Sequence, residues 1–389
     1  MTLIKSISGI RGTIGGEQGD NLTPVDVVKF VSAYGAWLKD RCKRERLRVI
    51  IGRDARVSGT MVNHLVTGTL IGLGIDILDI GLASTPTVEI AVIDEKSDGG
   101  IIITASHNPG EWNALKLLNE KGEFLSASDG QRIIELAESG KITYSGIEKL
   151  GELFYPGFYH KKHIGNIINL SMINTEAIRK ADFTVVLDCV NSVGGIIIPD
   201  LLKALGVTKI VELYCEPNGE FPHNPEPLPE NLSDLSNEVK HQGADVGFVV
   251  DPDVDRLAIV SEDGMFFGEE YTLVAVSDYI LRRSPGNTVS NLSSTRALKD
   301  ITEKHGGTYF ASAVGEVNVV EEMKKQNAVI GGEGNGGVIL PALHYGRDAL
   351  VGIALFLTHL AESGLKCSDL RKKYPDYFIT KSKVNLEPG

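Results

Sequence analysis

The sequence predicts an α/β protein built from three similar modules, and two observations support this prediction. Short runs of β-branched and other apolar residues alternate with amphipathic segments of helix length, which is typical of mostly parallel sheets covered by helices. The chain also has 389 residues, enough for two to three domains of roughly 150 residues each. Each predicted module places a turn rich in glycine, serine or threonine between a strand and the following helix.

The three modules follow one another along the chain with the same alternation of elements. The first has strands at 48–51, 75–80 and 100–104 and helices at 58–73 and 129–138. The second has strands at 183–187, 209–213 and 245–250 and helices at 194–205 and 232–241. The third has one strand at 288–292 and helices at 270–282, 295–304, 317–325 and 349–363.

Boundaries near residues 153 and 256 would divide the chain into modules of 1–153, 154–256 and 257–372. The remaining residues, 373–389, contain one strand-like run, Tyr377–Val384, and then end at the sequence LEPG. A strand without a sheet indicates the beginning of a fourth module.

The composition excludes several functional classes. Lys and Arg number 39 against 51 Asp and Glu, so the net charge of −12 argues against a nucleic-acid or membrane-surface partner. The chain has neither an apolar leader at its start nor a run of about 20 apolar residues, so we expect no secretion and no membrane span. The four cysteines are dispersed and form no Cys-x-x-Cys pair, which is typical of a reducing cytosol.

The sharpest motif is Asp251-Pro-Asp-Val-Asp-Arg256, directly after the apolar run 246–250. In extended chain, alternate residues face one side, so three carboxylates converge there, and such oxygens suit Mg²⁺. An EF-hand loop would need glycine where Arg256 stands. The alternative is a solvated acidic turn.

Two further motifs carry chemistry. Thr104-Ala-Ser-His-Asn-Pro109 presents Ser106 at the end of a buried strand, where α/β sheets bind ligands, with His107 and Lys116 as the nearest proton-handling groups. The glycine-rich segment 331–337 offers Glu333 and Asn335, which suit sugar hydroxyls. An ordinary polar turn and a flexible glycine turn are the respective alternatives.

Two basic turns, 8–12 and 52–59, could bring Arg11, Arg53 or Arg56 to a phosphate. Ordinary surface ion pairing explains either turn equally well, and Asp54 beside two arginines favours a structural role for the second.

The motifs TASHNP at 104–109, DPDVDR at 251–256 and GEGNGG at 332–337 resemble, in order and spacing, those of the α-D-phosphohexomutase family. The resemblance implies α/β/α domains with mixed sheets around a central cleft. It also implies that Ser106 is a phosphoserine, that Ser106 and the three aspartates hold one Mg²⁺, and that a hexose 1,6-bisphosphate is the activator. The metal site then comprises Ser106, Asp251, Asp253 and Asp255.

The same resemblance assigns the remaining residues and the reaction. Arg11, His107, Lys116 and Arg256 match the family's cationic and proton-transfer groups, and Lys116 would need a lowered pKa to act as a base. Glu333 and Asn335 match its sugar-reading loop. The family interconverts hexose 6-phosphates and 1-phosphates in the cytoplasm; the expected partner is thus a sugar phosphate, and the oligomeric state stays open.

Two differences from the family refine these expectations. The family carries a fourth domain with an Arg-x-Ser-Gly-Thr loop that this chain does not contain after Gly337, which predicts a missing or only begun fourth domain. Asn335 and Ser293 favour an amino-sugar substrate, glucosamine 6-phosphate. Phosphoglucomutase/phosphomannomutase activity, a non-catalytic sugar-phosphate binding fragment and a phosphatase remain as alternatives.

Overall fold

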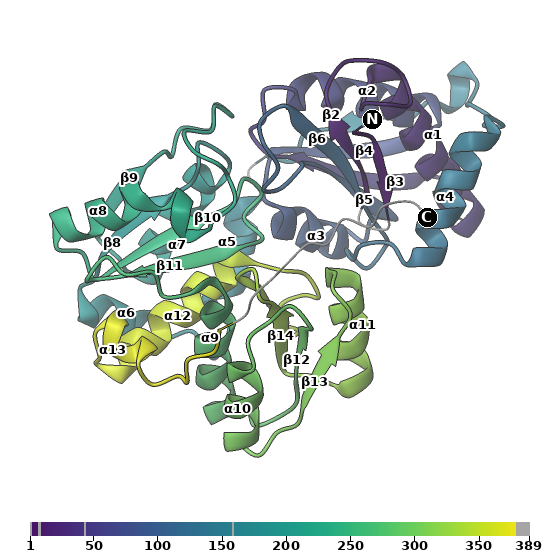
Figure 1. The fold of residues 1–389 in the computed structure, drawn as a ribbon. Helices are drawn as coiled ribbons and strands as arrows, with labels where there is room; N and C mark the ends of the chain where they lie inside the picture. Colours follow the sequence, from purple (N-terminus) through teal and green to yellow (C-terminus); the bar gives the residue numbers. More distant parts are fainter. Residues whose placement is uncertain (1, 7–8, 43, 158, 379–389) are drawn as a thin grey trace, which may run out of the picture.

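The computed structural model describes residues 2–6, 9–42, 44–157 and 159–378, and it shows three lobes in chain order (Figure 1). Each lobe contains one β-sheet with helices packed against it, and the three sheets contain seven, four and four strands. The predicted fold class, three α/β/α modules with mixed sheets, is confirmed. None of the helices in these ranges combines the length and the apolar character that a membrane span requires.

The first lobe has a mixed sheet in the order β1-β2-β6-β5-β3-β4-β7. Its strands are β1 (Ile4–Ser6), β2 (Gly9–Thr13), β3 (Leu47–Arg53), β4 (Ile75–Leu82), β5 (Gly99–Ile103), β6 (Trp112–Leu118) and β7 (Leu153–Phe154). Its helices are α1 (Pro24–Arg41), α2 (Gly59–Gly72), α3 (Thr85–Asp94), α4 (Ala127–Ser139) and the 3₁₀ turn Ile147–Lys149. Strand β5 is buried along its whole length in the middle of the sheet, as its apolar run predicts.

The second and third lobes share one sheet pattern: three parallel strands and one antiparallel edge strand, in the orders β11-β10-β8-β9 and β13-β12-β14-β15. The second contains α5 (His160–Ile168), α6 (Thr175–Ala181), β8 (Thr184–Asp188), α7 (Gly194–Leu205), β9 (Lys209–Leu213), the 3₁₀ turn Pro229–Asn231, α8 (Ser233–Gln242), β10 (Val246–Val250) and β11 (Leu257–Ser261). The third contains α9 (Glu269–Arg283), β12 (Thr288–Asn291), α10 (Ala297–Lys304), β13 (Tyr309–Ser312), α11 (Glu316–Gln326), β14 (Ile330–Glu333), β15 (Gly337–Ile339), α12 (Ala349–Ser363) and α13 (Cys367–Arg371).

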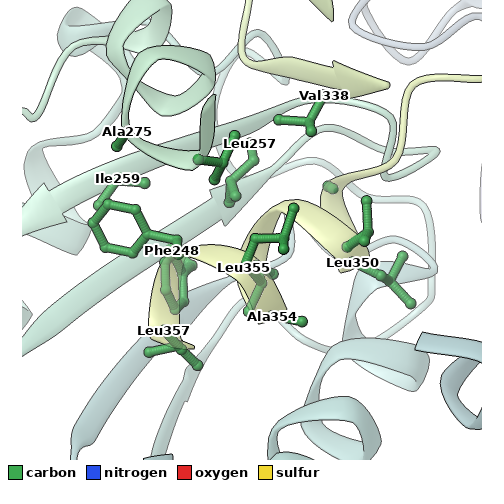
Figure 2. Close-up of a cluster of buried hydrophobic side chains, with 14 of the residues drawn as sticks. Phe248, Leu257, Ile259, Ala275, Val338, Leu350, Ala354, Leu355 and Leu357 are labelled. Atoms are coloured by element: carbon green, nitrogen blue, oxygen red, sulfur yellow. The ribbon is translucent and has the colours of Figure 1, made fainter. Parts of the chain in front are cut away.

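Helix α12 joins the cores of the second and third lobes. Its residues from Ala349 to Leu360 are all buried, as expected for a helix that is apolar on every side. Figure 2 shows Leu355 and its neighbours on this helix beside Phe248 and Ile259 of the second sheet and Val338 of the third. Phe356 meets the Phe248 ring edge-on, with ring centroids 6.1 Å apart. These two lobes therefore share one hydrophobic core, whereas most of the first lobe packs around its own.

Several elements differ from the sequence predictions. The second sheet continues past the predicted boundary at 256, because β11 pairs with β10 along its whole length. The glycine-rich segment 331–337 is not a free loop: residues 331–333 lie in β14, Gly337 begins β15, and residues 334–336 form the turn of the β14–β15 hairpin. The strand predicted at Tyr377–Val384 lies largely outside the described residues, as does most of the predicted fourth module.

Candidate active site

Ser106 lies just beyond the carboxyl end of β5, where α/β sheets place ligand-binding groups. Its backbone is left-handed, with φ of 49°, a conformation that a non-glycine residue adopts only when its surroundings enforce it. The Ser106 N–H donates to Thr104 Oγ1 at 2.9 Å, and Thr104 Oγ1 in turn donates to Asp54 Oδ2 at 2.6 Å. The backbone of Ser106 is thus fixed by the preceding turn.

Arg56 stabilises the segment 104–112 that carries Ser106, named here the serine loop. Its guanidinium is fully buried and donates to the carbonyl oxygens of Ser106, Asn108 and Pro109 at 2.6 Å each and of Trp112 at 3.0 Å, while Nε donates to Asp54 at 3.0 Å. All five N–H donors of the side chain are therefore used. This geometry favours the structural role over phosphate binding for the basic turn at 52–59.

The three aspartates lie in the turn that connects β10 to β11, and all are fully buried. One carboxylate oxygen from each of Asp251, Asp253 and Asp255 lies within 4.8 Å of those of the other two. The turn is held by the backbone N–H groups of Asp255 and Arg256, which donate to Asp251 Oδ1 at 3.1 Å each. Ser106 Oγ donates to Asp251 Oδ2 at 2.6 Å, across 145 residues of sequence.

The donor set of this cluster fits a hard divalent cation such as Mg²⁺. Among the described residues, Asp253 Oδ1 and Asp255 Oδ1 are buried without a hydrogen-bond partner, a costly state unless another group satisfies them. Burial, together with the charges of Asp255 and Asp253, raises the pKa of Asp251 well above its usual value. A cation offsets this crowding of negative charge, and all the available donors are oxygens.

Lys116, on β6, lies at the same cluster. Its Nζ is 2.6 Å from Asp253 Oδ2 and 3.3 Å from Asp255 Oδ2. Burial alone would lower the pKa of Lys116, but the two carboxylates outweigh it and raise the pKa well above its ordinary value. The lowered pKa that Lys116 would need to act as a base is therefore not present in this arrangement, because ion pairing dominates over desolvation.

His107 follows Ser106, with its Nδ1 3.5 Å from the serine Oγ. Burial, and next the positive charge of Arg256, lower the pKa of His107 to about 3. The imidazole is accordingly neutral at physiological pH, and it offers one donor and one acceptor rather than a charge.

Ser106, His107 and Lys116 face one cavity of about 660 Å³ that all three lobes line, whereas Asp251, Asp253 and Asp255 are fully buried and are not among its lining residues. The predicted site residues on its wall are Arg11, Ser106, His107, Lys116, Arg256, Glu333 and Asn335. Arg347, which was not predicted, also lines it. The buried Nε atoms of Arg11 and Arg256 have no hydrogen-bond partner among the described residues. A second hollow of about 590 Å³, near Arg41 and Cys42, contains none of the predicted site residues.

Glu333 and Asn335 form the wall contributed by the third lobe. Glu333 Oε1 accepts from Asn291 Nδ2 at 2.7 Å, and Glu333 Oε2 accepts from Asn335 Nδ2 at 3.3 Å. Arg347 Nη1 lies 2.9 Å from the same Oε2. The carboxylate is therefore fixed in orientation before any ligand arrives.

The sequence interpretation missed several residues at this site. Thr85, at the start of α3, donates its hydroxyl to Asp253 Oδ2 at 2.5 Å and its N–H to the Asp253 carbonyl at 2.9 Å, which fixes the acidic turn against the first lobe. Arg347 lies just before α12 and had no motif around it. Neither has a signal in the sequence, because both act through contacts between lobes.

A buried charged network next to the site was also missed. His344 Nδ1 lies 3.2 Å from Glu89 Oε2, and His344 Nε2 lies 3.4 Å from Asp348 Oδ2. Asp348 Oδ2 is also 3.0 Å from His163 Nε2. The network links helices α3 and α5 to the segment that precedes α12, so it fixes the third lobe against the first.

A serine hydroxyl beside an acidic cluster, in a cavity lined by cationic side chains, is the arrangement of enzymes that transfer phosphoryl groups. Within that class, three domain families match the chain: phosphoglucomutase/phosphomannomutase alpha/beta/alpha domain I at residues 3–143, domain II at 160–264 and domain III at 268–377. The chain therefore belongs to the phosphoglucomutase/phosphomannomutase family of α-D-phosphohexomutases, and it is an enzyme of the hexose phosphate mutase type.

Individual relatives agree with this family. The phosphoglucomutase/phosphomannomutase of Thermococcus kodakarensis is 37% identical over 381 residues, which cover 97% of this chain and 82% of the relative. The phosphoglucosamine/phosphogalactosamine mutase of Sulfurisphaera tokodaii is 30% identical over 98% of this chain and 82% of its own length. A solved phosphoglucomutase/phosphomannomutase family protein from Burkholderia thailandensis superposes with a TM-score of 0.84, 26% identity and coverage of 96% of this chain and 81% of that one.

Proposed function

We propose that this enzyme interconverts glucosamine 6-phosphate and glucosamine 1-phosphate through a phosphoserine at Ser106 and a hexose 1,6-bisphosphate. The observation that supports this most directly is the 2.6 Å hydrogen bond from Ser106 Oγ to Asp251, at the wall of a cation-lined cavity. The phosphoryl group would leave Ser106 Oγ for the free hydroxyl of the sugar monophosphate. The bisphosphate would then turn over in the cavity and return its other phosphoryl group to Ser106.

In this reaction the cationic side chains of the protein offset negative charge. A phosphoserine carries close to two negative charges, and the transferring group spreads charge over its oxygens. Arg11, Lys116 and Arg256 all line the cavity and offset that charge. His107, neutral because of its burial, supplies a hydrogen bond beside Ser106 Oγ.

Ser106, Asp251, Asp253 and Asp255 would hold one Mg²⁺ per chain. When bound, the ion would neutralise the negative charge that accumulates at the phosphoserine. A hexose 1,6-bisphosphate acts as the activator because it phosphorylates Ser106 from the same cavity.

Glu333 and Asn335 would recognise the sugar. Glu333 offers acceptor oxygens, and the side-chain amide of Asn335 offers both a donor and an acceptor for a substituent at C2. The amide favours an amino sugar. A second candidate substrate pair is glucose or mannose phosphate, which is favoured by the 37% identity to the T. kodakarensis phosphoglucomutase/phosphomannomutase.

Two measurements test the proposal. Intact-mass analysis after incubation with glucose 1,6-bisphosphate should show one added phosphate on the wild-type chain and none on the Ser106→Ala variant. Turnover of glucosamine, glucose and mannose 6-phosphates with Mg²⁺ should then show isomerisation, fastest for glucosamine 6-phosphate. Release of free phosphate would indicate a phosphatase, and phosphate-free Ser106 with binding but no turnover would indicate a sugar-phosphate binding protein.

A further inference from the structure

Among the described residues, Arg347 is the one cationic side chain of the cavity wall to which the proposed reaction assigns no role. Each of its three guanidinium nitrogens has a different carboxylate partner: Nη2 donates to Asp255 Oδ2 at 2.7 Å, Nε to Glu316 Oε2 at 2.9 Å, and Nη1 lies 2.9 Å from Glu333 Oε2. Its side chain is 9% exposed. All three partners come from different segments of the fold.

These contacts connect the acidic turn 251–256, the proposed metal loop, to the β14–β15 hairpin that carries Glu333 and Asn335, the proposed sugar hairpin. Asp255 belongs to the acidic turn of the second lobe, whereas Glu333 ends strand β14 and Glu316 begins helix α11, both in the third lobe. Asp255 Oδ2 accepts from both Arg347 and Lys116, whereas Asp255 Oδ1 has no hydrogen-bond partner among the described residues. The guanidinium thereby orients the carboxylate with one oxygen available for a cation.

The chain fixes Arg347 itself at both ends. Its backbone N–H donates to Glu316 Oε1 at 3.1 Å, and the next residue, Asp348, caps helix α12 by accepting from the N–H groups of Leu350 and Val351. The stem of Arg347 passes over Gly337, where a Cβ would come within 2.4 Å of Arg347 Cδ. Glycine at 337 thus leaves the space that the side chain occupies.

We propose that Arg347 is a positioning residue that sets Glu333 of the sugar hairpin and Asp255 of the metal loop in one fixed relation. The proposal rests on the metal and sugar sites assigned above. A planar, permanently charged fork can hold three carboxylates at once, whereas the single ammonium of a lysine cannot replace it. Sugar recognition and metal binding are accordingly coupled through one side chain.

The test measures two separate affinities on the full chain: Mn²⁺ by calorimetry, as a probe of the metal site, and glucosamine 6-phosphate in the presence of that ion. Arg347→Lys keeps the charge but removes the fork. It should weaken both affinities, the first by roughly tenfold to a hundredfold, as for other residues that orient metal ligands. Asn335→Ala should weaken only the sugar phosphate, and Arg371→Lys, a matched change in α13 away from the cavity, should alter neither.

A second variant tests the same coupling without changing the guanidinium group of Arg347. Gly337→Ala displaces the Arg347 stem and should reproduce the double loss. Thermal melting of each variant separates this loss from unfolding. If Arg347 is only a counter-charge, Arg347→Lys leaves the Mn²⁺ affinity within twofold of wild type and Arg347→Gln tightens it; that result overturns the proposal. A wild-type chain that binds no Mn²⁺ refutes the metal site itself and the coupling with it.

Discussion

The substitution Arg56→Lys tests the physical basis of the serine loop. Arg56 uses all five of its N–H donors, one on Asp54 and four on loop carbonyls. Lysine has three donors, so at least two of these hydrogen bonds are lost even in the best case. The positive charge remains beside the buried carboxylate of Asp54, so the variant isolates the hydrogen bonds from the ion pair.

The size of the effect follows from this count. Hydrogen bonds from a charged donor contribute about 1.5–3 kcal/mol each, so the loss of two destabilises the first lobe by about 3–6 kcal/mol. A domain's whole free energy of unfolding is only about 5–15 kcal/mol. We therefore expect Arg56→Lys to leave the first lobe marginally stable.

Urea denaturation followed by tryptophan fluorescence suits this measurement, because both tryptophans of the chain, Trp37 and Trp112, lie in the first lobe. The matched control is Arg44→Lys, whose side chain is 60% exposed and should change the free energy of unfolding by less than about 1 kcal/mol. A loss below about 1 kcal/mol for Arg56→Lys would contradict this prediction, since it would mean that the four carbonyls find other donors.

Three further outcomes are expected. Asp253→Asn removes a carboxylate of the proposed metal site and should abolish Mn²⁺ binding in calorimetry; unchanged binding contradicts the site. For His344, burial alone would lower the pKa, but the hydrogen bond with Asp348 and the nearby carboxylate of Glu89 outweigh it and raise the pKa from 6.5 to about 10. The contribution of His344 to stability is therefore complete below pH 6.5 and is lost as the pH rises towards 10. The difference in free energy of unfolding between wild type and His344→Asn should accordingly shrink over that range. A constant difference contradicts the raised pKa. Asn335→Ala should raise the KM for glucosamine 6-phosphate more than that for glucose 6-phosphate in steady-state kinetics, and an equal rise would argue against a C2 contact.

The parts of the site that sequence reasoning could predict are those that follow a buried strand. Ser106 and Asp251 each come after an apolar run, and the carboxyl ends of such strands are where α/β sheets present functional groups. The position of one beside the other was implied only by the family resemblance. No local rule predicts which lobes meet, since Ser106 Oγ and Asp251 belong to different sheets.

Neither the strand that carries Lys116 nor the direction of its pKa shift could be predicted from the sequence. Lys116 lies on β6, a strand whose sequence WNALKLL has no strict alternation and was not predicted, and it pairs opposite Ile102 of β5. The register of that antiparallel pair brings the ammonium to the serine loop. The direction of its pKa shift depended on Asp253 from another lobe, which no spacing along the chain could indicate. Thr85 and Arg347 were hidden for the same reason, because their partners also lie in another lobe.

The separation of Ser106 from Asp251 has a consequence for biosynthesis. The ribosome makes the serine loop 145 residues before the aspartate that accepts its hydrogen bond. Domains generally fold as they emerge, the N-terminal one first. A nascent chain therefore carries the serine loop for some time with no acidic partner, and the contact with Asp251 forms only once the second lobe has been translated and docked.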